Sequence, residues 1–119
     1  MSAFEVAARR LAVLILCGFI PLVHAAPQWC RGRVNNLLVD GSGDVLVHTS
    51  FRQDWIRICN VTKDSPGAPM SVCKSWYSNL QLAFAIPSDV MIQYADAPDC
   101  GQIPTYSSGP TPWYVQVLH

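Results

Sequence analysis

Four cysteines constrain this chain of 119 residues more than any other feature of its sequence: Cys30, Cys59, Cys73 and Cys100. An even number of cysteines in a short exported chain is typical of two disulfides, for which three pairings are possible. Zinc is the alternative, but no two of these cysteines have C-x-x-C spacing, and only His48 and His119 follow residue 25. We therefore expect two disulfides and no metal site.

Export is indicated by the first residues of the chain. Two arginines precede an apolar run over residues 11–23 and then small residues, which is the order of a secretory signal peptide. We predict a signal peptide over residues 1–25, a single domain over residues 26–119, and a periplasmic or secreted location. Cys17 lies in the apolar run without the small preceding residue of a lipidation site, so we expect it to be lost on processing.

Charge excludes two classes of partner. The chain carries 8 Lys and Arg against 8 Asp and Glu, so it has neither the basic excess nor the basic stripe of a nucleic-acid binder. It also has no polybasic membrane patch, and the apolar run near the amino terminus is too short to span a bilayer. We expect no nucleic-acid partner and no stable membrane insertion.

Three β-rich runs open the domain. Residues 33–39 and 44–49 flank a Gly and Asp cluster, which predicts a hairpin, and residues 55–61 add a third strand to form a meander. Residues 63–69 then break the pattern with two prolines and a glycine.

A helix is expected next, over residues 71–85, capped by Ser71 and stopped at Pro87. Its apolar side chains recur at spacings of three and four: Cys73, Trp76, Tyr77, Leu80, Ala83 and Phe84. Residues 90–94 alternate as a fourth strand, and a long Pro-rich and Ser-rich loop leads to a fifth strand over residues 113–118.

This order, β-β-β-α-β-β, is the order of the OB-fold, a small five-stranded barrel, and predicts a mainly β protein with one helix. In that barrel the first strand pairs antiparallel with the fourth, so Cys30 and Cys100 should lie close together. Cys59 ends the third strand and Cys73 begins the helix after a short loop. We therefore predict the disulfides Cys30–Cys100 and Cys59–Cys73, the second of which fixes the helix to the sheet.

No catalytic motif is present, and we predict a protein that is not an enzyme and needs no cofactor. His48, Ser50 and Asp54 supply the residue types of a hydrolytic triad, but no nucleophile-elbow motif accompanies them. We interpret His48 as a histidine on the polar face of a strand. Asn60-Val61-Thr62 matches an N-glycosylation acceptor, which we interpret as coincidence.

Aromatic residues are numerous for a domain of this size, and not all of them can be interior while their polar atoms stay hydrogen-bonded. Trp55 and Trp76 are expected in the core. Tyr106, Trp113 and Tyr114 lie in or beside the long loop and are predicted to be partly exposed and to bind a ligand. Aromatic faces beside short polar side chains suit sugar rings, and OB-folds bind oligosaccharides.

The middle of the chain resembles the subtilase cytotoxin B-subunit family. The resemblance covers Ile58-Cys59-Asn60-Val61, then Met70-Ser-Val-Cys73, the helix, and the strand Val90-Met-Ile-Gln-Tyr94. Those proteins are small, exported OB-fold subunits, the pentameric glycan-binding halves of bacterial AB-type toxins. The resemblance implies glycan binding and a homo-pentamer, but Ile86-Pro-Ser-Asp89 replaces the family's glycine-containing turn, and no sugar-contacting residue of the family is carried over.

Three functions follow from these observations. The first is an exported, non-enzymatic binding module for a glycan or protein; in a ring, its helix would line the pore with Lys74, Ser78 and Gln81. The second is a monomeric periplasmic inhibitor or accessory protein that binds another protein through residues 97–112. The third is a small hydrolase that uses His48, which we do not favour.

Overall fold

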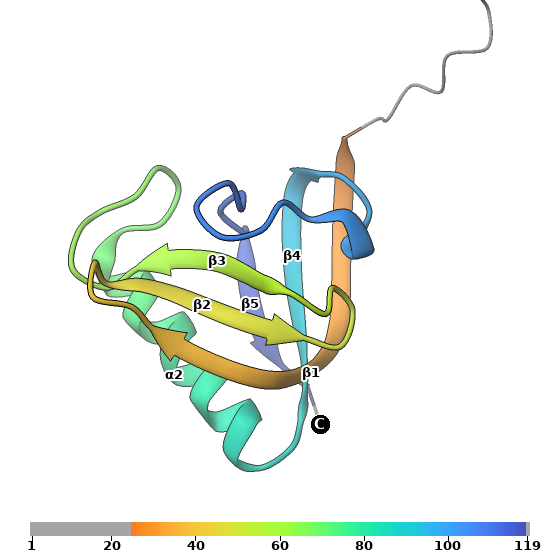
Figure 1. The fold of residues 1–119 in the computed structure, drawn as a ribbon, viewed down its shortest axis with the longest axis horizontal. Coiled ribbons are helices and arrows are strands. Elements are labelled where there is room, and N and C mark those ends of the chain that lie inside the picture. The colour runs from red at the N-terminus through yellow and green to blue at the C-terminus, as the bar shows by residue number, and fades with distance from the viewer. Residues whose placement is uncertain (1–24, 119) are drawn as a thin grey trace, which may run out of the picture.

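The computed structural model describes residues 25–118, which form five strands and one α-helix (Figure 1). The elements are β1 (Ala26–Val39), β2 (Asp44–Thr49), β3 (Trp55–Asn60), α2 (Met70–Ala85), β4 (Asp89–Ala97), the 3-10 helix η1 (Cys100–Gln102) and β5 (Tyr114–Val117). The predicted signal peptide, apart from its last residue, lies outside the described residues, and so does Cys17.

The strands form one antiparallel sheet in the order β3-β2-β1-β4-β5, which confirms the predicted mainly β fold and its element order. Within residues 25–118 the edge strands β3 and β5 do not pair, so strand pairing does not show a closed barrel. The chain between β4 and β5 runs beside β3 instead, where the Tyr106 N–H donates to the Trp55 carbonyl at 3.0 Å.

Strand β1 is long and bent, and it joins the two halves of the sheet (Figure 1). Its first half pairs with β4 and its second half with β2, with a register shift between Val34 and Asn36 where the strand bends. Gly32 stands on the buried side, where an added Cβ would lie 2.5 Å from the Ser50 hydroxyl oxygen. The prediction that this strand starts at residue 33 is wrong, because a cysteine and a glycine occupy its inward positions and hide the alternation.

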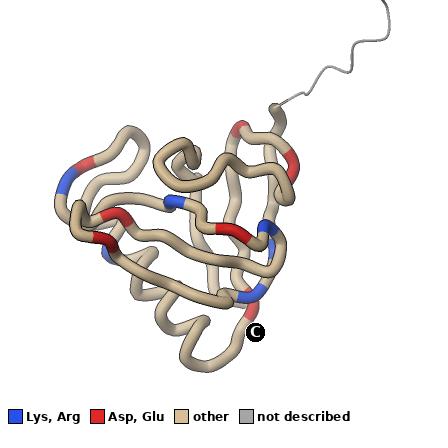
Figure 2. Tube along the Cα trace, viewed as in Figure 1, with Lys and Arg blue, Asp and Glu red and all other residues tan. Residues whose placement is uncertain are grey.

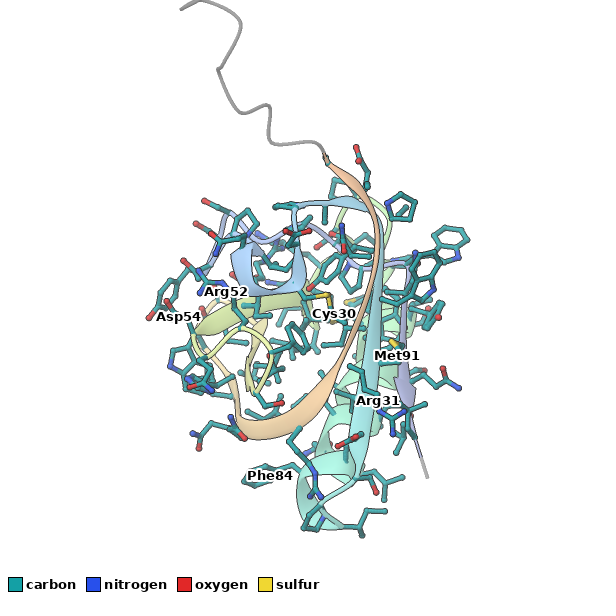
Figure 3. The ribbon with its side chains drawn as sticks, turned by 90° about the vertical axis from the view of Figure 1, so that its right-hand side faces the viewer. Cys30, Arg31, Arg52, Asp54, Phe84 and Met91 are labelled. Atoms are coloured by element: carbon teal, nitrogen blue, oxygen red, sulfur yellow. A yellow bond between two sulfur atoms is a disulfide. The ribbon has the colours of Figure 1, made fainter. Side chains whose placement is uncertain are left out.

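The core lies between the concave side of the sheet and α2. Side chains alternate along β4, so that Val90, Ile92 and Tyr94 are buried in the core while Met91 and Gln93 belong to the outer face. Figure 3 shows the same division, with Met91 and Arg31 on the side of the sheet opposite the disulfide of Cys30. Burial of each large apolar side chain contributes about 1.5–3 kcal/mol to folding.

Helix α2 packs against β1 and β5 and ends, as predicted, just before Pro87. The predicted cap by Ser71 is wrong. The helix begins at Met70, and a side chain outside the helix serves its first turn: the Met70 N–H donates to the Asp64 carboxylate at 2.8 Å. Phe84, one of the apolar residues that recur along the predicted helix, is 50% exposed.

Both predicted disulfides are present. Cys30–Cys100 and Cys59–Cys73 join Cα atoms that are 5.5 Å and 5.6 Å apart. The first ties the start of β1 to η1 after β4, and the second ties the end of β3 to the first turn of α2. Two disulfides are typical of proteins that fold in an oxidising compartment.

Candidate functional site

An open groove lies on the outer face of β1 and β4, beside the start of β5. It has a volume of about 440 Å³ and is lined by Pro27, Trp29, Gln93, Ala95 and Trp113, which we call the aromatic groove. Strand register places Trp29 of β1 opposite Gln93 of β4. On the opposite edge of β4, the backbone N–H of Trp113 donates to the backbone carbonyl of Gln93 at 2.6 Å. Trp29, near the amino end of the domain, and Trp113, near its carboxyl end, therefore both lie beside Gln93 on β4.

Both indoles of the groove are open to solvent. Trp29 is 60% exposed and Trp113 is 72% exposed, and they are the two most exposed large apolar side chains among the described residues. Strand alternation explains the position of Trp29, because Cys30 next to it is fixed inward by its disulfide. A tryptophan exposed to water forfeits the large burial energy of its ring, so this pair of indoles is the candidate binding surface of the described chain.

Gln93 lies between the two indoles and is only 6% exposed. Its Nε2 donates to the Tyr94 carbonyl at 2.8 Å, while its Oε1 is buried and has no hydrogen-bond partner. The donor bond fixes which end of the amide is free, since only the nitrogen can donate. A buried acceptor without a partner costs about 1–3 kcal/mol, so this atom lowers the stability of the fold.

Three other buried side-chain atoms in the described part of the chain lack a partner: His48 Nδ1, Thr49 Oγ1 and the Tyr94 hydroxyl. None of these residues lines the aromatic groove. Burial raises the pKa of the Tyr94 phenol far above its ordinary value of 10.0, so this side chain stays neutral beneath the sheet. Among the described residues, Gln93 is therefore the only one that both lines the aromatic groove and has a buried acceptor without a hydrogen-bond partner.

The three residues predicted from the sequence to bind a ligand do not form one site. Trp113 lines the aromatic groove, and Tyr114 pairs with Gln93 in the register of β4 and β5. Tyr106 is 53% exposed but lies against β3, bridged to Ile56. The partial exposure predicted for these side chains is found, and it also holds for Trp29.

Sequence reasoning missed Trp29 and Gln93 as site residues. Trp29 precedes the predicted first strand, residues 33–39, so strand alternation could not be used to predict that its side chain points away from the core. In the sequence, Gln93 is a polar residue at an outward position of an alternating strand, and such a position does not indicate a binding role. The sequence did contain one signal, the predicted disulfide of Cys30. A cysteine that points inward places the neighbouring Trp29 on the outer face, if β1 already pairs with β4 at that point.

The three residues of the hydrolase hypothesis, His48, Ser50 and Asp54, each contact a residue outside this set. His48 packs edge to face on Trp55, with ring centres 5.8 Å apart. The Ser50 hydroxyl accepts the Arg33 N–H at 2.9 Å, and the Asp54 carboxylate accepts the Trp55 N–H at 2.7 Å. No hydrogen bond joins these three side chains to one another within residues 25–118.

The side-chain amide of Asn60 is also buried, and both its nitrogen and its oxygen are hydrogen-bonded within the chain. Its Nδ2 donates to the Ser42 carbonyl and to the Asp44 carboxylate, both at 2.9 Å. Its Oδ1 accepts from the Thr62 N–H, the Thr62 hydroxyl and the Lys63 N–H at 2.7–3.1 Å. The glycosylation motif at this residue therefore coincides with a fully buried side chain whose nitrogen is already bonded.

Charges are interspersed along the described chain, with no face of one sign (Figure 2). The two arginines nearest the groove on β1, Arg31 and Arg33, both pair with Asp89 at 3.1 Å. No group of three His, Cys, Asp or Glu side chains is placed to hold a metal ion in this part of the chain. Its single α-helix is not long and apolar enough to cross a membrane.

Comparisons of the chain with protein-family models, with curated proteins and with solved structures give no match.

Proposed function

We propose that this protein is an exported, non-enzymatic binding module that holds a glycan in the aromatic groove. The observation that carries the proposal is the combination of two exposed indoles with a buried, unpartnered acceptor between them, at Trp29, Trp113 and Gln93. Indole faces stack on the C–H faces of sugars, and an amide oxygen accepts a sugar hydroxyl.

A glycan fits this groove better than other polymers. A nucleic acid would need free cations for its phosphates, whereas Arg31 and Arg33 share Asp89. Binding of a protein through residues 97–112 is less favoured, because that segment is packed against the sheet. Ile103 is fully buried, and the Arg52 guanidinium donates to its carbonyl at 2.8 Å.

The test is a glycan array probed with the disulfide-intact protein lacking residues 1–25. We expect Trp29→Ala and Trp113→Ala each to weaken binding of any retained glycan at least about fivefold, since one stacked ring contributes about 1–3 kcal/mol. Phe84→Ala is the matched control, because Phe84 is an exposed aromatic on α2. Absence of glycan binding, or equal loss in the control, would refute the proposal.

A toxin B-subunit-like ring of five belongs to the same proposal. Its support is the exposure of three apolar side chains, Val72 and Leu82 on α2 and Ile86 directly after it, which are 36–49% exposed. Light scattering after size-exclusion chromatography gives the mass directly. A mass of five chains supports the ring, and a monomer removes this part of the proposal while leaving the glycan site untouched.

A further inference from the structure

The side chains that line the aromatic groove limit the charge that a ligand can carry there. Pro27 and Ala95 are apolar, Trp29 and Trp113 are neutral aromatic residues, and Gln93 is an uncharged amide. A carboxylate, sulfate or phosphate group that entered the groove would therefore exchange water for carbon atoms and neutral dipoles. Removal of an ion from water is costly unless an opposite charge pairs with it.

Gln93 does not supply a partner for an anion. Its Nε2 donates to the Tyr94 carbonyl at 2.8 Å, and its Oε1 is the atom without a partner. An amide oxygen carries a partial negative charge, and a carboxylate is itself only an acceptor, so the two groups repel each other. A hydroxyl can donate to such an oxygen. The side-chain amide among the lining residues therefore disfavours an anion and suits an uncharged polar group.

The arginines nearest the groove on β1 are bound to other groups. The Nε atoms of Arg31 and Arg33 each lie 3.1 Å from the carboxylate of Asp89. Arg33 Nη1 also donates to the Pro87 carbonyl at 2.6 Å. An anion in the groove that recruited Arg31 would have to compete with Asp89 for its guanidinium.

The other end of the groove carries a negative charge. Asp96 is exposed and directly follows the lining residue Ala95 along β4. The salt bridges within residues 25–118 are made by Asp44 and Asp89, so none of them neutralises Asp96. An acidic ligand would therefore meet a like charge at this end, at a distance where salt screens part of the repulsion.

We propose that the aromatic groove selects uncharged sugars and rejects those that carry a carboxylate, sulfate or phosphate on the ring that it holds. Neutral hexoses and N-acetylhexosamines meet this description, whereas uronic acids and sialic acids do not. The inference rests on the proposed glycan-binding function and names the class of glycan that the site selects.

The experiment uses an array of glucose, galactose, mannose and N-acetylglucosamine oligomers, beside the uronic acid oligomers of the three hexoses and the methyl esters of those acids. Every ring of a uronic acid oligomer carries a carboxylate, so the charge enters the groove whichever ring is held. Methyl esterification removes the charge and keeps the ring. We expect neutral oligomers to be retained, and each free acid to bind at least about tenfold more weakly than its neutral counterparts at neutral pH.

Salt and the variant Arg31→Gln give independent measurements. If no ligand charge contributes to binding, the affinity for a retained neutral oligomer should change less than about twofold between low salt and about 0.5 M sodium chloride. Arg31→Gln should leave it equally unchanged, because this guanidinium is paired with Asp89. Binding of an anionic ligand through Arg31 would weaken under both conditions.

Ala95→Lys places a cation among the lining residues, and Ala95→Met is the matched control of similar length without a charge. Ala95 is exposed, so there is room for either side chain. We expect the lysine variant to raise the affinity for the free acids relative to their methyl esters at least about threefold over the methionine variant, the size of an exposed ion pair.

The outcomes separate this inference from the proposed function. If free acids bind as tightly as their neutral counterparts, and this binding is lost in Trp29→Ala and Trp113→Ala, the selection of uncharged sugars is overturned while the glycan site stands. Loss of affinity in high salt or in Arg31→Gln, or an equal ratio of acid to ester in the two Ala95 variants, also overturns it. Absence of binding to every glycan on the array overturns both proposals.

Discussion

Asn60 and Gln93 are both buried side-chain amides on strands of one sheet, yet their hydrogen bonding differs. Asn60 makes five hydrogen bonds with the chain around it. Gln93 makes one donor bond and leaves its oxygen without a partner. An amide that serves only the fold has its bonding capacity filled by the chain. The Gln93 oxygen instead has no partner within the described chain, and the proposed function assigns a ligand donor to it.

Each amide also lies near a disulfide, and removing the disulfides should have the largest effects. The sequence separations are 70 residues for Cys30–Cys100 and 14 for Cys59–Cys73. Loop-closure entropy predicts losses in the free energy of unfolding of about 4 kcal/mol and about 3 kcal/mol for the two double Cys→Ser variants. Chemical denaturation measures both. The ranking is wrong if the shorter loop proves the more important.

The next effect is expected at Asn60. Asn60→Leu keeps the branched shape of the side chain but replaces its polar atoms with methyl groups. Its hydrogen-bond partners at Ser42, Asp44, Thr62 and Lys63 then lose their bonds, so we expect a loss of about 3 kcal/mol in the free energy of unfolding. Thermal and urea melts of the disulfide-intact protein measure it. Asn36→Leu on the exposed side of β1 is the control and should change stability little.

Gln93→Met should change stability by less than about 1 kcal/mol, in contrast to Asn60→Leu. The lost donor bond to the Tyr94 carbonyl costs about 1 kcal/mol, and removal of an unpartnered acceptor returns a similar amount. The same melts give the value. A loss as large as that of Asn60→Leu would show that the Gln93 amide is structural, as that of Asn60 is.

The smallest effect concerns Asp40, in the turn between β1 and β2. Its carboxylate accepts hydrogen bonds from Ser42 and Asp44, and the Ser42 hydroxyl is the main cause that holds the Asp40 pKa below its ordinary value of 3.8. The stability from these bonds is therefore present above pH 3.8 and is lost as the pH falls through the lower folded pKa. NMR titration of this carboxyl should show a midpoint below 3.8, and a midpoint at or above that value contradicts the assignment.

The sequence predicted the architecture because its signals were local and agreed with one another. The meander, the helix ending before Pro87, and both disulfides follow from periodicity, turn residues and strand order. The cap of α2 could not be predicted, since Asp64 reaches Met70 from a loop. The aromatic groove could be predicted only in part, because its residues come together through the register of β1 on β4.

Strand β1 and the approach to β5 have a consequence for how the protein matures. Trp29 and Trp113 stand near the two ends of the domain, so their approach closes nearly the longest loop that the chain can form. Contacts of such sequence separation are expected to form late in folding. A chain cut short before residue 113 would lack one side of the groove however well its first strands paired. Under the proposed function, ligand binding would then report that synthesis and folding had both been completed.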